Sequence, residues 1–374
     1  MSRWAYKLAL LRGLLMGDRA YAGPAYVNID VTHRCNLQCY YCRWHSPLAE
    51  TQRLQPTMPK DLSPDTFAAL CAELRAMGTR TVQFVGAGEP LLHPHIFELI
   101  RIAKACDLAV LMYTNGTLLR AERLRSLMAS GLDVLRVSLA ATSNAEYVRK
   151  HPHATPGEFD RIVAGMRLLA RRKTEVAATR PVVEMTHPIA RDGAASIADA
   201  AELAHVTGCA RLHFSVMLDF GEEGIRPFTL PDDQVAEVHA HLRQAGRRLA
   251  ALGIAANVEQ VVLRYRIGAS VWDHFPCYTA WYGSFVATDG GVHVCQRSAD
   301  PVGTLAENRF GEIWNNPAYR AFRRQSLSGA PPASWLRRTD CRYCPHAVNN
   351  HRVHRAFRRV AALRVALTAR GRQD

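Results

Sequence analysis

Short runs of apolar residues alternate with longer stretches of helical periodicity through the middle of the chain. The apolar runs are rich in β-branched and aromatic residues and short enough for strands. These predicted strands occupy residues 25–32, 81–85, 109–113, 134–139, 181–185 and 211–216. The predicted helices between and after them occupy residues 62–78, 95–106, 119–130, 158–172, 195–206 and 232–251.

The clearest helix signal lies after the first strand. Ser63 is a predicted N-cap, Pro64 fits the first helical position, and Gly78 ends the pattern. The strand segments are apolar on both faces, which is typical of a parallel sheet covered by helices. Six strand–helix units therefore predict an α/β fold, a partial (βα)6 TIM-like barrel, whose chemistry lies in the loops that follow the strands.

Both ends of the chain predict amphipathic basic helices. In residues 1–24 and 351–374, apolar residues recur at helical spacing among lysines or arginines. Such helices either pack on the body with their cations in solvent, or contact an anionic membrane surface or partner. The apolar positions are Trp4, Leu8, Leu11 and Leu15 in the first segment, and Val353, Phe357, Val360, Leu363 and Leu367 in the second.

Composition limits the class of protein. Hydrophobic residues make up 48% of the 374 residues, which is enough for a large core, and no run of about 18 apolar residues predicts a membrane span. The first segment has no clear signal-peptide cleavage pattern, so we expect a cytoplasmic protein, with association to a membrane surface as an extension of that expectation. In a reducing compartment, ten cysteines indicate metal or redox chemistry.

Three of these cysteines lie in the loop after the first predicted strand, in the sequence CNLQCYYC. Cys35, Cys39 and Cys42 place three thiols at the edge of the sheet where the chemistry is expected. Such thiols favour zinc or an iron–sulfur cluster. A structural zinc needs four ligands, for which His33 and His45 are conceivable additions. A [4Fe–4S] cluster held by three cysteines leaves one iron open to another ligand.

This spacing, CxxxCxxC after a first strand, resembles the radical S-adenosylmethionine (radical SAM) superfamily over about residues 25–220. The resemblance implies a [4Fe–4S] cluster at the three cysteines and S-adenosylmethionine on the open iron, cleaved to a 5′-deoxyadenosyl radical. The sequence GAGEP at 86–90 resembles the superfamily's GGEP element, with Ala87 as a departure. By this resemblance the S-adenosylmethionine contacts are Tyr41, Gly86, Gly88, Glu89, Asn115, Ser138 and Arg149.

A second cysteine set follows the barrel and surrounds a predicted hairpin at 284–295. These four residues are Cys277, Cys295, Cys341 and Cys344. They resemble the SPASM/twitch extensions of radical SAM enzymes, and because no cysteine follows Cys344, a twitch-type domain with one auxiliary [4Fe–4S] cluster is implied. The spacing is similar to that of 2-deoxy-scyllo-inosamine dehydrogenase-type enzymes. Structural zinc on the same thiols is the alternative.

The predicted organisation has four parts. An N-terminal basic helix (1–24) precedes the radical SAM barrel (25–260), which is followed by the twitch-type iron–sulfur domain (261–350) and a basic C-terminal helix (351–374). The implied partners are a small-molecule substrate, carbohydrate or anionic, and an electron donor such as flavodoxin or ferredoxin. No nucleic acid is expected, because the aromatic and basic signature of RNA readers is missing.

The resemblance implies oxidation of an alcohol of a sugar or cyclitol to a ketone, with the auxiliary cluster as electron acceptor. Alternatives are a radical SAM sugar epimerase, a peptide-modifying enzyme, and a non-catalytic metal- or RNA-binding protein. The peptide reading is disfavoured by the lack of an evident N-terminal peptide-recognition domain. Alcohol oxidation needs a base. The candidates are Tyr147, His151, His153, His187, Arg191, Asp219, Glu222 and Glu223.

Overall fold

A ten-stranded, mostly parallel sheet forms the centre of the computed structural model, which describes residues 2–49, 60–191, 193–219, 222–268, 273–298, 300–327 and 344–370. The strand order is β10-β9-β8-β1-β2-β3-β4-β5-β6-β7, and the neighbours from β8 to β7 are parallel. The strands are β1 (Tyr26–Asp30), β2 (Thr81–Val85), β3 (Ala109–Thr114), β4 (Val134–Ser138), β5 (Val182–Ile189), β6 (Arg211–Val216), β7 (Ala255–Ala256), β8 (Gly283–Val286), β9 (Gly291–His293) and β10 (Gly303–Thr304).

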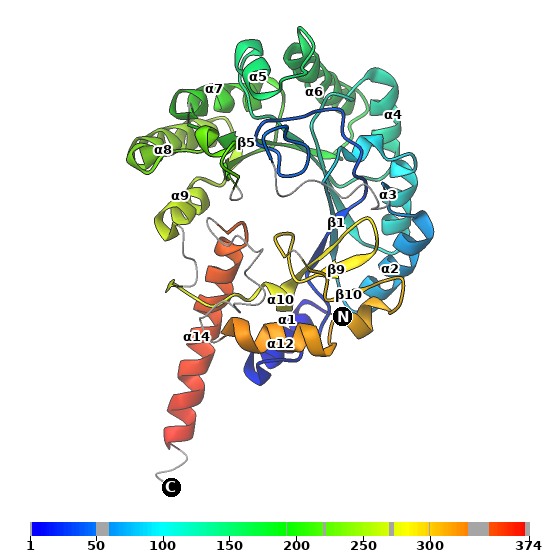
Figure 1. Cartoon of the computed structure of the whole chain (residues 1–374), viewed down its shortest axis with the longest axis vertical. Coiled ribbons are helices and arrows are strands. Elements are labelled where there is room, and N and C mark those ends of the chain that lie inside the picture. The colour runs from blue at the N-terminus through cyan, green and yellow to red at the C-terminus, as the bar shows by residue number, and fades with distance from the viewer. Residues whose placement is uncertain are drawn as a thin grey trace.

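Helices cover the outer face of this sheet and form an arc around it in Figure 1. Those of the barrel are α2 (Pro64–Ala76), α3 (Ile96–Ala105), α4 (Ala121–Ala129), α5 (Asn144–Lys150), α6 (Glu158–Glu175), α7 (Gly193–Val206), α8 (Val235–Ala251) and α9 (Val258–Ile267). The others are α1 (Arg3–Met16), α10 (Thr279–Tyr282), α11 (Phe310–Ile313), α12 (Pro317–Leu327) and α14 (Ala347–Arg370). The arc is open on one side, so the partial-barrel prediction is confirmed.

The six predicted strands and the helices between them are present, within a few residues. Ser63 caps α2 as predicted, because its side chain accepts a hydrogen bond from the Thr66 amide at 3.2 Å and Pro64 takes the first helical position. Helices α5, α9, α10, α11 and α12 are not among the predicted helices.

The strands differ from the prediction on their inner face. Alternate residues such as Val82, Val110 and Leu135 are fully buried under the helices, as expected for an α/β fold. The residues between them are polar in several strands, among them Gln83 and Arg136, which line a cavity inside the barrel. The prediction of strands apolar on both faces was therefore wrong for the inner face.

The segment after the barrel continues the same sheet. Strand β8 pairs in parallel with β1, opposing Tyr26 to Gly283, and β9 turns back on β8 with Phe285 opposite His293. The hairpin was predicted, but its pairing with β1 was not. The guanidinium of Arg323 on α12 is buried and donates to the carbonyl oxygens of Ala280 and Trp314, which fastens this segment together.

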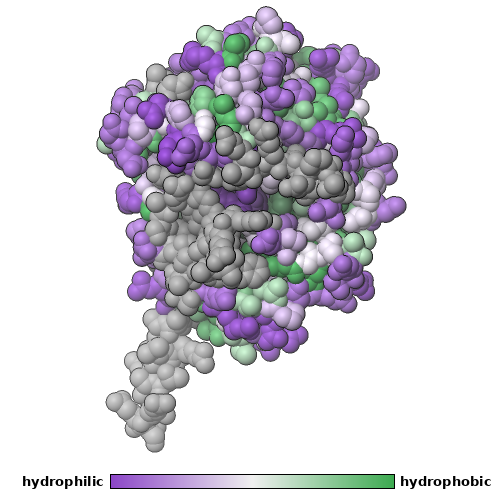
Figure 2. Space-filling model, in the orientation of Figure 1, coloured by the Kyte–Doolittle hydropathy of each residue, from purple (hydrophilic) through white to green (hydrophobic). Residues whose placement is uncertain are grey.

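The predicted apolar faces of the two terminal helices lie differently in the structure. Tyr6 and Leu14 form the buried side of α1, whereas Trp4 and Leu8 on the predicted apolar face are exposed. Helix α14 extends away from the body in Figure 1, after Val353 and Phe357 pack against the core. The face of the molecule shown in Figure 2 is largely hydrophilic where it is coloured, with scattered hydrophobic residues. Among the described helices, none combines the length and apolar character needed to cross a membrane.

Candidate active site

The loop after β1 carries the first three cysteines to the cavity inside the barrel. Cys35, Cys39 and Cys42 are half-buried and all line this space. Backbone amides point at two of the sulfurs, from Leu37 to Cys35 Sγ at 3.5 Å and from His45 to Cys42 Sγ at 3.3 Å. Burial raises the pKa of the Cys35 thiol to about 11 and that of Cys39 well above its usual value. The sulfurs therefore need a positive partner to lie here as thiolates.

The arrangement of these sulfurs fits a cluster of several irons better than one metal ion. The negative charges of Cys42 and Cys35 both raise the pKa of Cys39, which shows that the three sulfurs lie close enough for their thiolates to repel one another. Within the described ranges, however, no three His, Cys, Asp or Glu side chains converge on a point that could hold a single ion. His33, a conceivable fourth ligand, instead contacts Thr288 Oγ1 through Nε2 at 3.1 Å. These residues fit a three-cysteine [4Fe–4S] cluster, which spreads its ligands over several irons.

The GAGEP turn after β2 packs directly on the cysteine loop. A Cβ on Gly88 would lie 2.4 Å from the carbonyl oxygen of Arg34, and one on Gly86 would lie 2.1 Å from the carbonyl oxygen of Gly88. Only glycine fits at either position. The Glu89 amide donates to the same Arg34 carbonyl at 2.7 Å. These contacts therefore fix the position of the GAGEP turn relative to the cysteine loop at this end of the cavity.

Glu89 joins this turn to the loop after β3. Its carboxylate accepts hydrogen bonds from the amide of Leu91 at 3.0 Å, the hydroxyl of Thr114 at 2.8 Å and the amide of Asn115 at 2.6 Å. The side chain is buried, and burial raises its pKa while these donors oppose the rise. Asn115 in turn donates to Asn36 Oδ1 in the cysteine loop at 3.0 Å.

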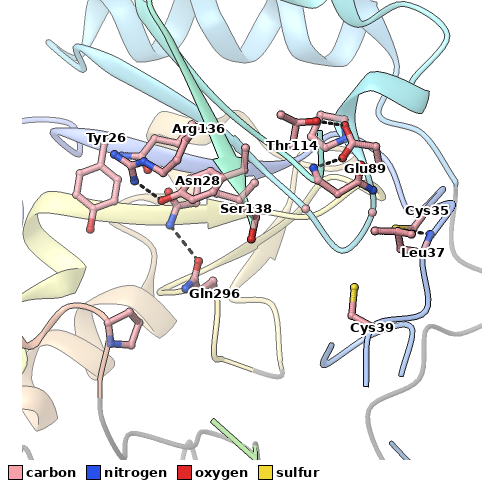
Figure 3. A pocket seen from close by; sticks show the side chains of 18 of the residues that line it. Tyr26, Asn28, Cys35, Leu37, Cys39, Glu89, Thr114, Arg136, Ser138 and Gln296 are labelled. Carbon is pink, nitrogen blue, oxygen red and sulfur yellow. Dashed lines mark hydrogen bonds between the residues drawn. The ribbon is translucent and has the colours of Figure 1, made fainter. Parts of the chain in front are cut away.

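Most of the predicted S-adenosylmethionine contacts come together around one cavity. Gly86, Gly88, Glu89, Asn115 and Ser138 line its first compartment, of about 660 Å³. A second compartment, of about 450 Å³, shares Cys39 and Ser138 with it and is lined also by Tyr41. Figure 3 shows Cys35, Cys39 and Glu89 at one end of the first compartment and Tyr26, Asn28 and Arg136 at the other. The volume and polar lining suit small-molecule binding.

Arg149 is the predicted contact that the structure does not bring to this cavity. It lies on the exposed face of α5 and lines neither compartment. The next residue, Lys150, points inward instead, where its ammonium donates to Glu146 and to the carbonyl of Ala140. Its own carbonyl accepts from the Tyr40 amide at 3.1 Å, which ties α5 to the cysteine loop. Arg149 therefore lies outside both compartments in the structure, and its contact with S-adenosylmethionine stays a prediction.

The second cysteine set lies next to residues of the cavity wall, because Gln296 and Pro345, the chain neighbours of Cys295 and Cys344, line both compartments. Cys277, Cys295 and Cys344 repel one another enough to raise the pKa of Cys277, after the larger effect of burial, to about 12. Burial raises the pKa of Cys344, and the nearby guanidinium groups of Arg297 and Arg264 oppose the rise. Three close thiols beside two cations fit an iron–sulfur cluster with net negative charge. Cys341 lies outside the described residues.

Two buried polar atoms at the far end of the cavity have no hydrogen-bond partner among the residues that the structure describes. They are Asn28 Oδ1 and His346 Nε2. The other polar atoms of these side chains are engaged, Asn28 Nδ2 with Gln296 Oε1 at 3.4 Å and His346 Nδ1 with Tyr26 Oη at 3.0 Å. Because buried polar groups are nearly always paired, these two atoms indicate the place of a hydrogen-bonding ligand.

The predicted base candidates are mostly placed elsewhere. Tyr147 and His151 line the second compartment, and burial lowers the pKa of His151 to about 4. His187 is fully buried between Leu139 and Ser196, and Asp219 pairs with Arg226. The six candidates that line neither compartment are His153, His187, Arg191, Asp219, Glu222 and Glu223.

The prediction missed Asp30, which lines the second compartment. It lies at the end of β1 and is buried. Burial raises its pKa to about 7, although the Ala87 amide and the Arg43 guanidinium oppose the rise and Asp289 adds to it. One signal was visible in the sequence: an ionisable residue inside the otherwise apolar strand that leads to the cysteine loop.

Comparison with known protein families finds a match for the barrel and another for the segment that carries the second cysteine set. Residues 29–185 match the radical SAM superfamily, and residues 277–345 match SPASM, an iron–sulfur cluster-binding domain. The four-part division of the chain is still a prediction, because strand β8 continues the sheet of the barrel.

Several characterised relatives share parts of the sequence. The AdoMet-dependent heme synthase of Methanosarcina barkeri is 26% identical over 78% of this chain and 82% of its own, and the PqqA peptide cyclase of Gluconobacter oxydans is 27% identical over 80% and 79%. GTP 3′,8-cyclase of Chlorobaculum tepidum is 41% identical, but the match spans 34% of this chain and only 36% of that protein.

Solved structures show the same fold at low identity. Native anSMEcpe with bound AdoMet has a TM-score of 0.63 at 15% identity and covers 93% of this chain and all of its own. Streptococcus suis SuiB bound to S-adenosylmethionine has a TM-score of 0.63 at 12% identity over 81% of this chain and 68% of its own. The family matches show that this chain contains a radical SAM domain and a C-terminal SPASM domain, with iron–sulfur clusters and S-adenosylmethionine as its cofactors.

Proposed function

We propose that this enzyme oxidises an alcohol of a small polyhydroxylated substrate, such as a sugar or cyclitol, to a ketone. When bound, S-adenosylmethionine and its cluster supply the radical that removes a hydrogen atom, and the auxiliary cluster accepts one electron. Cys35, Cys39 and Cys42 would hold the first cluster, and Cys277, Cys295 and Cys344, with Cys341, the second. The hydroxyl proton then has to pass to a residue of the chain.

The observation that carries this proposal is the polar end of the cavity between the two cysteine sets. Asn28 Oδ1 and His346 Nε2 are buried there without partners, and Tyr26, Gln83 and Arg136 line the same space. A substrate with several hydroxyls can satisfy an acceptor such as Asn28 Oδ1 by donating to it, which an apolar substrate cannot do. The contacts favour a substrate rich in hydroxyl groups.

We assign the proton acceptor to Asp30. It is the carboxylate that lines the second compartment, and its pKa of about 7 lets it hold a proton that it takes from a substrate hydroxyl. The Asp30→Asn variant should form ketone about 100-fold more slowly or worse, while still cleaving S-adenosylmethionine. In the unaltered enzyme, ketone formation should rise with pH through about 7 as Asp30 ionises.

Asp289 offers a matched control. Its carboxylate raises the pKa of Asp30 but lines neither compartment. Asp289→Asn should keep ketone formation and move the midpoint of the pH profile to lower pH, because a repelling charge is removed. If Asp30→Asn forms ketone at the original rate, Asp30 is not the acceptor.

The reaction class is tested with a panel of sugars, cyclitols and nucleotide sugars in heavy water. Oxidation predicts a product lighter by two hydrogen atoms that carries no solvent deuterium. An epimer carrying solvent deuterium would contradict oxidation and establish the epimerase alternative.

Peptide modification is the second candidate, and the comparisons give the reason. PqqA peptide cyclase is among the relatives, and related folds include SuiB bound to its precursor peptide SuiA and anSMEcpe bound to a Cp18Cys peptide. This second candidate is established if the enzyme converts none of the sugars, cyclitols and nucleotide sugars but modifies a peptide. In either case we propose flavodoxin or ferredoxin as the source of the electron that starts the reaction.

A further inference from the structure

Helix α1 carries apolar residues on two opposite sides, and only one of them is covered by the protein. On the covered side, Tyr6 and Leu14 are buried, and a Cβ on Gly13 would lie 3.1 Å from the Trp281 ring. The Tyr6 hydroxyl also donates to the carbonyl of Gly23 at 3.0 Å. These contacts fix the orientation of α1 on the body.

The uncovered side is an exposed apolar stripe. We define the stripe as Trp4, Leu8, Leu15 and Met16, which are 75%, 64%, 38% and 61% exposed. These are four of the seven large hydrophobic residues exposed in the described part of the chain, so the helix concentrates them. At about 100° per residue, Trp4, Leu8 and Leu15 fall within about 40° of one another and nearly opposite Tyr6. Their exposure follows from the fixed orientation of the helix.

Cations flank the stripe. Lys7 lies beside Trp4, with its Nζ 4.9 Å from the ring centroid. Arg12 is exposed and by helical position lies along the other edge, where its guanidinium stacks on the Tyr21 ring at 4.1 Å. The helix contains no acidic residue, and the nearby Asp18 is held by Arg320 and Arg324 on α12. Helices that lie in the interface of an anionic membrane have this arrangement, an apolar stripe bordered by positive charges.

We propose that α1 attaches this protein to the surface of an anionic lipid membrane, with the stripe inserted among the headgroups and Lys7 and Arg12 beside the phosphates. Trp4 is suited to this depth, because indole rings favour the membrane interface. A second copy of the chain fits less well, since symmetric pairing of two such helices would bring their cationic edges together with no acidic residue to compensate. Helix α14 is the weaker anchor because its Val353 and Phe357 are already packed against the core.

The test uses the full chain and sedimentation with vesicles of phosphatidylcholine alone or mixed with phosphatidylglycerol. The protein should bind the mixed vesicles and should bind the neutral vesicles at least about tenfold more weakly, and added salt should weaken the binding. Replacing two stripe residues together, Trp4→Ser with Leu8→Ser, should weaken binding to mixed vesicles by at least about tenfold. The fold should survive, because both side chains are exposed.

Two control variants separate the causes. Val176→Ser with Val206→Ser removes exposed apolar residues elsewhere (65% and 39% exposed) and should leave binding unchanged. Lys7→Gln with Arg12→Gln should remove the preference for the anionic vesicles. The proposal is overturned if the unaltered chain does not bind mixed vesicles, or if the stripe variant binds them equally well. A dimer in solution that Trp4→Ser with Leu8→Ser dissociates would also overturn it, in favour of a second copy.

Discussion

Gly88→Ala should uncouple the two loops that build the S-adenosylmethionine end of the cavity. The added Cβ would meet the carbonyl oxygens of Arg34 and Thr32 at 2.4 and 2.7 Å, and both belong to the backbone leading to Cys35. A normal contact needs about 3.4 Å, so the loops have to separate by close to an ångström. That movement breaks the hydrogen bond from the Glu89 amide to Arg34 at 2.7 Å.

The expected cost is about 1–3 kcal/mol in unfolding free energy, as for other overpacked sites, and the effect on S-adenosylmethionine cleavage should be larger. A displacement of about 1 Å in a reacting geometry lowers rates by about 100-fold. The assay is iron content, S-adenosylmethionine binding and 5′-deoxyadenosine formation after anaerobic reconstitution. Ala87→Gly, which restores the GGEP sequence of the superfamily, is the matched control and should retain activity. A Gly88→Ala variant that binds and cleaves S-adenosylmethionine normally would refute this account of the turn.

Three further predictions concern charge and packing. Burial would raise the pKa of Glu184, but His213 and Arg136 outweigh this effect and hold the pKa at about 2. The ionised carboxylate therefore stabilises the fold at pH values above its unfolded pKa. This stabilisation is lost as the pH falls from about 4.5 toward 2. Glu184→Gln should lower the unfolding free energy at pH 7 by about 3 kcal/mol and flatten the acid limb of a thermal-unfolding series; an unchanged acid limb would contradict the assignment. Arg323→Met should destabilise the protein by about 3 kcal/mol or more in denaturant unfolding, because several buried carbonyl oxygens lose their donor. Arg320→Met, which removes only an exposed pair with Asp18, should cost less than about 1 kcal/mol, and equal losses for the two variants would show that burial is not the cause.

The elements of the barrel could be predicted because local patterns specify them. Strand and helix periodicity, the Ser63 cap and the glycines of the GAGEP turn act over a few residues, and each was found where the sequence placed it. The cysteine spacing was equally informative, since the first set lines the cavity and the residues next to Cys295 and Cys344 in the SPASM domain line it as well.

The errors concern relations between distant segments. Pairing of β8 with β1 joins residues more than two hundred positions apart, which no local pattern encodes. Arg149 was assigned by motif, whereas the turn of α5 leaves it exposed and directs Lys150 inward, so its contact stays a prediction. The sequence left open whether the face of α1 that carries Trp4 and Leu8 packs on the body, because the opposite side of this helix is apolar as well. Asp30 was overlooked because its importance depends on a cavity that distant segments form only in the folded protein.

The central claim is that one chain holds two iron–sulfur clusters across one cavity. Its most direct test is iron content and 5′-deoxyadenosine formation after anaerobic reconstitution with iron and sulfide. Two [4Fe–4S] clusters predict about eight irons in the unaltered protein, and about four in each of two variants, one with Cys35, Cys39 and Cys42 changed to Ala and one with Cys277, Cys295 and Cys344 changed to Ala. Cleavage of S-adenosylmethionine should be lost only in the first variant. If the unaltered protein holds about four irons and the first variant none, the second site does not hold an iron–sulfur cluster. If a protein loaded with both clusters does not cleave S-adenosylmethionine, the account is contradicted.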